Sequence, residues 1–297
     1  MNFGYVTPQN WGVEDPQDVV DLAVRAEELG YDSVWVNHHI LNVGYIYDRL
    51  QDRPYYDALT FLTWVAALTE RVRLGTTVLV LPYLNPLVLA KSVATLDAMS
   101  GGRVTLGVGV GMLREENEAL GSDFTTRGAY ADESIEIMRE LWTADDPNYS
   151  GRFFEFGGGF KFSPKPAQNP LPILIGGMSR AAMRRSARLG DGWHPNSGSI
   201  EDMAARAESL REMWREEGRD PDDLQLVVRC ELDVLDTASD NADTPMVGTP
   251  DQLARAVSEY ASLGVSEIVL GISTSDVDRI RRIQESFAEK VMPLVSG

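Results

Sequence analysis

Short apolar runs alternate with amphipathic stretches along the whole chain. The apolar runs have the length of strands, whereas apolar residues recurring every three to four positions predict helices between them. The first helix shows the pattern clearly, because Asp15 suits an N-cap, Pro16 suits the first helical position and Gly30 suits the end. We expect eight strands, at residues 2–7, 33–36, 72–81, 103–110, 173–175, 192–195, 224–235 and 265–270.

The predicted strands alternate with eight predicted helices, which requires parallel strands joined by crossovers. Eight such units close a TIM (β/α)8 barrel, which commonly takes about 250 residues and fits this chain of 297. A doubly wound open sheet is the alternative, but it usually has about five or six strands. We therefore expect a single α/β domain over residues 1–297, with residues 143–170 inserted between strands four and five and a mobile loop at 236–245.

Composition narrows the classes of partner. The 45 acidic and 27 basic residues give a net charge of -18, which argues against nucleic acid or an anionic membrane as the main partner. Cys230 is the single cysteine, which excludes a disulfide framework and a cysteine-rich zinc module. No apolar run approaches the ~18 residues of a membrane span and the first residues lack a signal segment, so we expect a cytoplasmic protein.

All three histidines lie where the active sites of TIM barrels are found. Active groups of TIM barrels lie at the C-terminal ends of the strands, and His38, His39 and His194 all follow predicted strands. Neighbouring residues of an extended segment point to opposite sides, so one of His38 and His39 is expected to face the barrel axis. The pair could equally be solvated loop residues. A metal site with His194 as third ligand has no supporting H-E-x-x-H spacing or cysteine, so we expect no metal.

Two glycine-rich strand ends are further candidates. Gly107, Gly109 and Gly111 share one face, which indicates either close packing or a flat ligand lying against bare backbone. Their spacing is not the G-x-G-x-x-G dinucleotide fingerprint, so a Rossmann site is unsupported. Residues 176–179 lie between a strand and a helix, where backbone amides and the helix N-terminus favour a phosphate. A tight turn with a capping serine explains the same residues.

Several stretches together resemble the bacterial luciferase-like flavin and deazaflavin oxidoreductases. These are Ala-Glu-Glu-Leu-Gly-Tyr-Asp-Ser-Val-Trp-Val at 26–36, Arg-Leu-Gly-Thr-Thr-Val at 73–78 and Leu-Gly-Val-Gly-Val-Gly at 106–111, followed by 172–177 and 190–193. They follow the family's order over residues 1 to about 195, and the last third matches in architecture only. The phrase Gly-Val-Gly-Met-Leu-Arg-Glu-Glu, which ends at Glu116, is similar to the branch that depends on coenzyme F420.

The resemblance implies a tricyclic cofactor at the barrel rim, coenzyme F420 or alternatively FMN. It implies a non-proline cis peptide between Thr77 and Val78 that bends the ring, and it places His39 near the reacting edge. Some deazaflavin relatives carry carboxylates where this chain has His38 and Met112, so Glu115 or His39 would have to serve as the acid. The other residues implied to contact the cofactor are Gly109, Val110, Gly111, Gly176, Gly177, Met178 and Ser179.

We therefore expect an oxidoreductase that transfers a hydride between coenzyme F420 and a small organic substrate. His39 suits the accompanying proton transfer, because an unperturbed imidazole has a pKa of about 6.5. The alternatives are an FMN-dependent monooxygenase that receives reduced flavin from a separate reductase, a non-catalytic flavin-binding barrel, and a metal-dependent hydrolase. Family analogy implies a homodimer that buries the second and third helices.

Three further groups of side chains are assigned to the mouth of the site. Cations near the mouth that would offset an anionic cofactor are Lys161, Lys165 and Arg180. The insertion's phenylalanines either cover the substrate or form a satellite hydrophobic cluster; they are Phe153, Phe154, Phe156, Phe160 and Phe162. The aromatic residues that suggest an apolar cavity are Tyr5, Trp11, Tyr45, Tyr47 and Tyr55.

Overall fold

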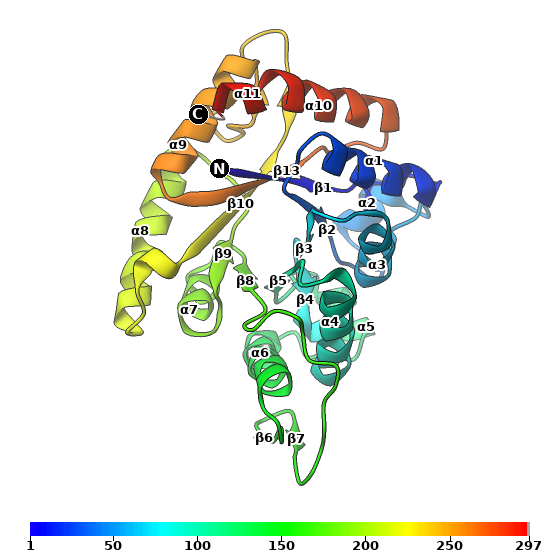
Figure 1. Cartoon of the computed structure of the whole chain (residues 1–297), viewed down its shortest axis with the longest axis vertical. Coiled ribbons are helices and arrows are strands. Elements are labelled where there is room, and N and C mark those ends of the chain that lie inside the picture. Colours follow the sequence, from blue (N-terminus) through cyan, green and yellow to red (C-terminus); the bar gives the residue numbers. More distant parts are fainter. Residues whose placement is uncertain (296–297) are drawn as a thin grey trace.

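A closed parallel barrel forms the centre of the computed structural model, which describes residues 1–295 (Figure 1). The sheet runs in the order β3-β2-β1-β13-β10-β9-β8-β5-β4, and an additional pairing of β3 with β5 closes it. Its strands are β1 (Asn2–Val6), β2 (Ser33–Val36), β3 (Arg73–Thr76), β4 (Leu79–Val80), β5 (Val104–Gly109), β8 (Ile173–Gly176), β9 (Gly192–His194), β10 (Gln225–Glu231) and β13 (Val265–Gly271).

The predicted third strand, 72–81, is divided. The chain leaves β3 after Thr76, passes through a cis peptide between Thr77 and Val78, and continues as β4, so β3 and β4 together occupy one of eight barrel positions. Both segments pair with β5. The expectation of one continuous strand was wrong, whereas the cis peptide that the resemblance implied is present.

Within residues 1–295, eight long helices surround the barrel, each following a barrel strand (Figure 1). They are α1 (Pro16–Glu28), α3 (Ala58–Leu68), α4 (Pro86–Ser100), α6 (Arg127–Thr143), α7 (Arg180–Leu189), α8 (Ile200–Glu216), α9 (Pro250–Ser262) and α10 (Val277–Lys290). Sequence analysis missed the shorter helices, which are α2 (Tyr45–Leu50), α5 (Arg114–Ala119), α11 (Met292–Val295) and the 3-10 turns η1 (Leu81–Tyr83) and η2 (Pro221–Asp223).

The helices begin where the sequence provides caps. Asp15 accepts a hydrogen bond from the amide of Gln17 at the start of α1, and Thr249 donates its amide to the side chain of Gln252 (3.1 Å) at α9. The larger core packs these helices against the strands. A second cluster fills the barrel itself and consists of Val6, Trp35, Leu174, Val227 and Val269. The barrel is therefore a packed scaffold whose openings lie at its ends.

The insertion lies at the edge of the molecule. It carries the antiparallel pair β6 (Tyr149–Ser150) and β7 (Glu155–Phe156), which Figure 1 shows beyond the ends of α4 and α6. The loop expected at 236–245 lies between β11 (Asp233–Val234) and β12 (Val247–Gly248), which pair with each other. No helix within residues 1–295 combines the length and hydropathy of a membrane span.

Candidate active site

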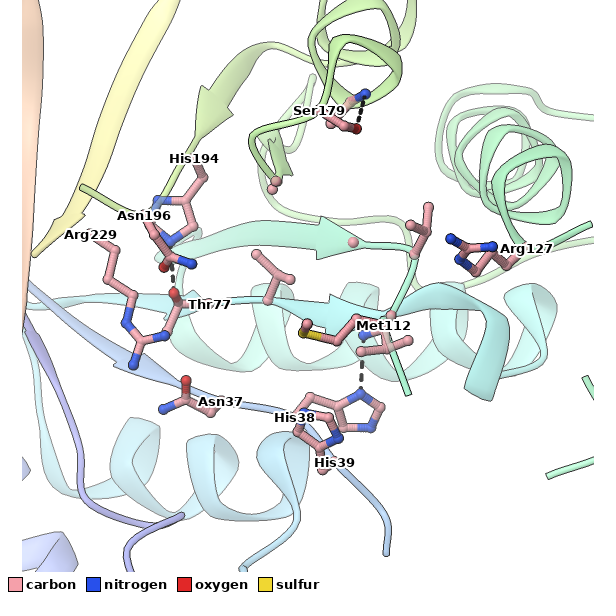
Figure 2. Close-up of a pocket in the computed structure, with 18 of the residues that line it drawn as sticks. Asn37, His38, His39, Thr77, Met112, Arg127, Ser179, His194, Asn196 and Arg229 are labelled. Atoms are coloured by element: carbon pink, nitrogen blue, oxygen red, sulfur yellow. Dashed lines mark hydrogen bonds between the residues drawn. The ribbon is translucent and has the colours of Figure 1, made fainter. Parts of the chain in front are cut away.

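A cavity of about 640 Å³ opens at the C-terminal ends of the barrel strands (Figure 2). Its walls come from the ends of β2, β5, β8 and β9, from the Thr77–Val78 segment, and from α2 and the starts of α6 and α7. This is the face on which TIM barrels place their chemistry. The cavity has an apolar shelf, a histidine with a buried carboxylate, and two ends that carry arginines.

His39 is held between an acid and a phenol. Its Nδ1 lies 2.6 Å from Oε2 of Glu116, and its Nε2 lies 3.0 Å from the hydroxyl of Tyr45. Glu116 is fully buried and also accepts hydrogen bonds from the amides of Ile40 (2.7 Å) and Leu41 (3.1 Å). Because a carboxylate only accepts, the Nδ1 of His39 carries the proton and Nε2 is the atom free to exchange one.

Hydrogen bonds keep Glu116 ionised despite its burial. Burial would raise the pKa of this carboxyl, but the donors from His39, Ile40 and Leu41 outweigh it and lower the pKa. The result is a fixed negative charge behind a histidine that has only 12% of its side chain exposed. Such a charge orients an imidazole and stabilises it when it is protonated.

The other two histidines, His38 and His194, form hydrogen bonds that connect neighbouring strand ends. His38 accepts a hydrogen bond from the amide of Val80 at Nδ1 (3.1 Å), which ties β2 to β4. His194 has Nδ1 2.7 Å from the carbonyl of Val227, so its Nε2 accepts from the hydroxyl of Thr77 (2.8 Å). Burial lowers the pKa of both His38 and His194 to about 4. Both rings are therefore neutral at ordinary pH.

The apolar shelf is formed by Val78 and the chain around Gly109. A Cβ added to Gly109 would meet Cγ2 of Val78 at 2.7 Å, and one added to Gly176 would meet Cγ1 of Val78 at 2.7 Å. Both glycines therefore pack closely against Val78. For Gly109 the close neighbour is this segment between β3 and β4 and not a helix. A flat ligand would lie on Val78 together with the backbone rather than on backbone alone.

One end of the cavity lies between α6 and α7. Ser179 caps α7 by accepting from the amide of Ala182 (3.2 Å), while the first amides of that helix stay available for an anion. Arg127 and Arg185 line the cavity nearby, and Arg185 also pairs with Asp132. We call this the helix end of the cavity.

The opposite end holds a second pair of cations, Arg229 on β10 and Arg49 on α2, with Tyr55, Asn37 and Asn10 beside them. Figure 2 shows Arg229 and Asn37 across the cavity from Arg127. Burial lowers the pKa of both arginines. We call these five residues the arginine end.

Most residues that the resemblance assigned to the cofactor line this cavity. They are His38, His39, Thr77, Val78, Gly109, Val110, Gly111, Met112, Gly176, Gly177 and Ser179. Met178 lies outside the lining, where its carbonyl accepts from Arg206 (3.0 Å). Glu115 is exposed and does not line the cavity, because α5 turns Glu116 inward instead. The structure therefore brings Glu116, and not Glu115, into contact with His39.

The expected cations and the insertion lie elsewhere. Lys161 pairs with Asp146, and Lys165 donates to the carbonyls of Leu141 (2.7 Å) and Ala144 (2.6 Å), so neither reaches the cavity. Arg180 is exposed and does not line the cavity. No residue of 143–170 lines it either. Phe154, Phe156 and Phe162 of the insertion pack against the main core, and Phe153 and Phe154 lie edge-on to Tyr130.

The aromatic prediction was right for two residues. Tyr45 and Tyr55 line the cavity, whereas Tyr5 is buried in the core and Tyr47 is exposed on α2. Trp11 lies behind the lining, where it stacks on the guanidinium of Arg49 at 4.3 Å. Within residues 1–295 no group of three or more His, Cys, Asp or Glu side chains is placed to hold a metal ion.

Sequence reasoning also missed functional candidates. Arg229 carried a signal, because it interrupts the apolar run Leu-Val-Val-Arg-Cys at 226–230 and a cation inside a barrel strand needs a reason. No sequence signal distinguished Glu116 from its neighbour Glu115, because only the orientation of α5 buries one and exposes the other. Arg49 and Tyr55 come from a segment with no predicted element.

The chain and its fold are similar to known proteins. The model of the luciferase-like monooxygenase family matches residues 1–243, so the chain belongs to that family. It is 39% identical over 187 residues to an F420-dependent glucose-6-phosphate dehydrogenase of Amycolatopsis mediterranei (strain U-32), covering 62% of this chain and 54% of that protein. The chain thus spans about half the length of this relative.

Two other likenesses extend the comparison. A protein of Mycobacterium bovis, named as uncharacterised, is 35% identical over 226 residues, which cover 71% of this chain and 76% of that protein. Among solved structures, an F420-dependent secondary alcohol dehydrogenase in complex with an F420-acetone adduct has a TM-score of 0.82 at 20% identity. That alignment covers 100% of this chain and 99% of the other, and at this identity it supports the fold alone.

Proposed function

We propose that the protein is an F420-dependent oxidoreductase that moves a hydride between the coenzyme and a small organic substrate. The observation that carries the proposal is the His39–Glu116 pair beside an apolar shelf at the C-terminal rim. Relatives named as F420-dependent glucose-6-phosphate dehydrogenases, from Amycolatopsis mediterranei and Kineococcus radiotolerans, support the choice of coenzyme.

The cavity fits a tricyclic coenzyme with a phosphate-bearing side chain. Val78, with the backbone at Gly109, offers an apolar surface for the ring, and the helix end offers free amides and Arg185 for the phosphate. The arginines of this end also offset the net charge of -18, which opposes binding of an anionic coenzyme. When bound, the deazaflavin supplies the carbon that takes or gives the hydride.

The chain's own residues handle the proton. Oxidation of an alcohol removes a hydride with two electrons from carbon and a proton from oxygen, and reduction adds both. His39 Nε2 accepts that proton or returns it, Glu116 stabilises the charged imidazole, and Tyr45 is a second hydroxyl at this nitrogen. The surrounding cavity orients the substrate and excludes water.

Coenzyme binding tests the proposal. Titrating the purified protein with coenzyme F420 and with FMN should give a dissociation constant for F420 at least about tenfold lower, since Arg127 and Arg185 favour the more anionic ligand. Anaerobic turnover with the reduced coenzyme should then be observed. Tighter binding of FMN together with strict dependence on oxygen would instead establish the FMN-dependent monooxygenase that the family description favours.

We also propose that the chain forms a homodimer through α3 and α4. These helices carry exposed apolar side chains, which are Trp64 and Leu68 on α3 and Val88 and Met99 on α4. Light scattering should give twice the monomer mass of 32.8 kDa for the wild type. Trp64→Glu combined with Val88→Glu should give the monomer mass, and a monomeric wild type would contradict the proposal.

A further inference from the structure

The arginine end contains two cations that have no acidic partner. Arg25, Arg139 and Arg185 each form an ion pair with a carboxylate. Within the described part of the chain, by contrast, neither Arg229 nor Arg49 has a carboxylate within 4.0 Å, and no hydrogen bond from the Arg229 guanidinium is formed. Glu231, two residues further along β10, accepts instead from the amide (2.9 Å) and the hydroxyl (2.6 Å) of Ser273.

This arrangement is unfavourable for the protein by itself. Burial disfavours both guanidinium charges, and repulsion from Arg49 disfavours the charge of Arg229 further. Unpaired buried cations are rare because desolvation is costly, and a protein with an acidic excess has carboxylates available to pair them. An anion that enters between the two arginines would relieve both costs at once.

Most of the unpartnered polar atoms at the arginine end match an anion. Three buried donors there lack a partner: Arg49 Nε, the hydroxyl of Tyr55 and the side-chain amide nitrogen of Asn37. One buried acceptor there, Asn10 Oδ1, also lacks a partner, and Arg127 Nε is an unpartnered donor at the helix end. A buried donor without an acceptor is costly, so three gathered at one end indicate that a ligand supplies the acceptors. An oxyanion presents several acceptor atoms in a small volume and suits this set.

The arginine end also lies at the right place for a substrate. Tyr45, whose hydroxyl contacts His39 Nε2, is close enough to Arg49 and Arg229 that both lower its pKa against the raising effect of burial. The arginines therefore flank the proton-transfer residue. Arg229 lies across the cavity from Arg127, which marks the side of the helix end (Figure 2).

We propose that Arg229 and Arg49, together with Tyr55 and Asn37, bind a carboxylate or phosphate group of the substrate. The reacting carbon of such a substrate then lies between this group and His39, over the shelf formed by Val78. The inference rests on the proposed function, since it defines the substrate class of that same reaction: small organic anions. Arg229 and Arg49 are the specificity-determining residues.

Anion binding without coenzyme tests the inference directly. We would titrate the wild type by calorimetry with inorganic phosphate and separately with acetate, so that the two arms distinguish phosphate from carboxylate recognition. At least one should bind, and Arg229→Met should weaken it by about tenfold or more. Arg229→Lys should keep part of the affinity, because it retains the charge and loses only the fork of donors.

A matched variant controls for loss of charge. Arg281→Met removes an exposed cation on α10 that pairs with Asp278. It should leave affinity for the probe within about twofold of the wild type. If Arg229→Met does not fold, as judged by circular dichroism, Arg49→Met should show the same loss.

The outcomes separate this inference from the proposed function. Absence of anion binding, or binding that depends on Arg185 and not on Arg229 or Arg49, overturns the inference. Loss of F420 affinity in Arg229→Met with unchanged anion affinity overturns it too, because the arginine would then serve the coenzyme. Failure of the wild type to bind F420, with anion binding still dependent on Arg229, contradicts the proposed function and leaves the anion site standing.

Discussion

Two buried carboxylates at opposite ends of the barrel differ in the direction of their pKa shifts. Glu116, at the rim, has a lowered pKa because three donors outweigh the effect of burial. Glu267 lies at the start of β13, on the barrel floor, and burial raises its pKa although Ser33 and Trp35 donate to it. Burial alone therefore does not set the charge of a carboxyl in this protein.

The difference follows from the kind and number of donors. Glu116 accepts hydrogen bonds from two backbone amides and an imidazole. Glu267 accepts from one hydroxyl and one indole N–H (3.1 Å), both at the same carboxylate oxygen. The rim thus maintains a charge that a reaction can use, and the floor holds a carboxyl that mainly connects β2 to β13. This division agrees with barrels in which the top face carries chemistry and the bottom face carries stability.

The largest expected effect is the pH dependence of the free energy of unfolding, to which groups at the rim and on the floor contribute with opposite sign. His38 and His194 have a pKa of about 4 when folded and 6.5 in the unfolded chain. Above pH 6.5 both are neutral in either state. As the pH falls, the unfolded chain takes up protons first, so the free energy of unfolding decreases until about pH 4. The full loss is about 3 kcal/mol for each histidine, of which about 2 kcal/mol falls between pH 7 and pH 5. Urea denaturation at pH 7 and pH 5 should show this part of the loss.

A variant of each region checks the assignment. His194→Gln should make the free energy of unfolding less dependent on pH between 7 and 5. Glu267 acts in the opposite sense: its raised pKa gives stability below the unfolded value of 4.5 that is lost as the pH rises through the folded value. Glu267→Gln should therefore make stability rise more steeply with pH. Equal pH dependence in all three proteins would break the comparison.

The second effect concerns catalysis at the rim. Glu116→Gln removes the charge behind His39, and we expect kcat to fall about a hundredfold, with the dissociation constant of coenzyme F420 unchanged. Glu115→Gln is the matched control, because its side chain is exposed and kcat should stay within about twofold. Glu116→Asp should recover part of the rate. Equal losses in both glutamine variants would mean that the charge, not the contact with His39, matters.

The third effect concerns stability at the floor. Glu267→Ala leaves the Ser33 hydroxyl without its acceptor, whereas the Trp35 indole N–H keeps only the Ser33 hydroxyl as an acceptor, and we expect a loss of about 2 kcal/mol in the free energy of unfolding. Because this carboxyl lies away from the cavity, kcat should change less than about twofold. Denaturant unfolding measures the first and steady-state kinetics the second. A large fall in kcat at full stability would contradict the division between the two ends.

The smallest effect refines the account of Glu267. Ser33→Ala removes one donor and leaves the indole of Trp35 in place, so the cost should be about 1 kcal/mol. With fewer donors, the pKa of Glu267 should rise further, and the loss of stability on the alkaline side should extend to higher pH. The same denaturation series tests this. Unchanged pH dependence would show that the hydroxyl does not influence the carboxyl.

The barrel was predictable because each strand and helix has a pattern that can be recognised within its own segment of the sequence. Caps such as Asp15 and short apolar runs such as 33–36 depend on neighbours in sequence, and eight repeats of strand and helix then admit few closed arrangements. The division of the third strand at Thr77 was less accessible, because a strand pattern of apolar residues continues through Leu79 and Val80.

The site was predictable only in part, since its geometry depends on contacts between distant segments. His39 could be placed at a strand end, but its partner Glu116 lies 77 residues away on a helix of six residues that no pattern predicted. Arg229 and Arg49 meet only when the barrel closes, and neither has a motif. Lys161 and Lys165 were expected near the mouth of the cavity but lie elsewhere. Their position in the insertion did not indicate where the insertion packs on the barrel.

The register between β1 and β13, from Asn2 opposite Glu267 to Val6 opposite Gly271, joins the first and last strands of the chain. A fragment that ends at residue 243 would therefore leave the edges of β1 and β10 without a neighbour, and exposed edges of parallel strands invite pairing between molecules. The seam forms late during synthesis, since β1 must wait until β13 has been made. Expression of shortened versions of this chain is thus expected to yield aggregates instead of smaller closed barrels.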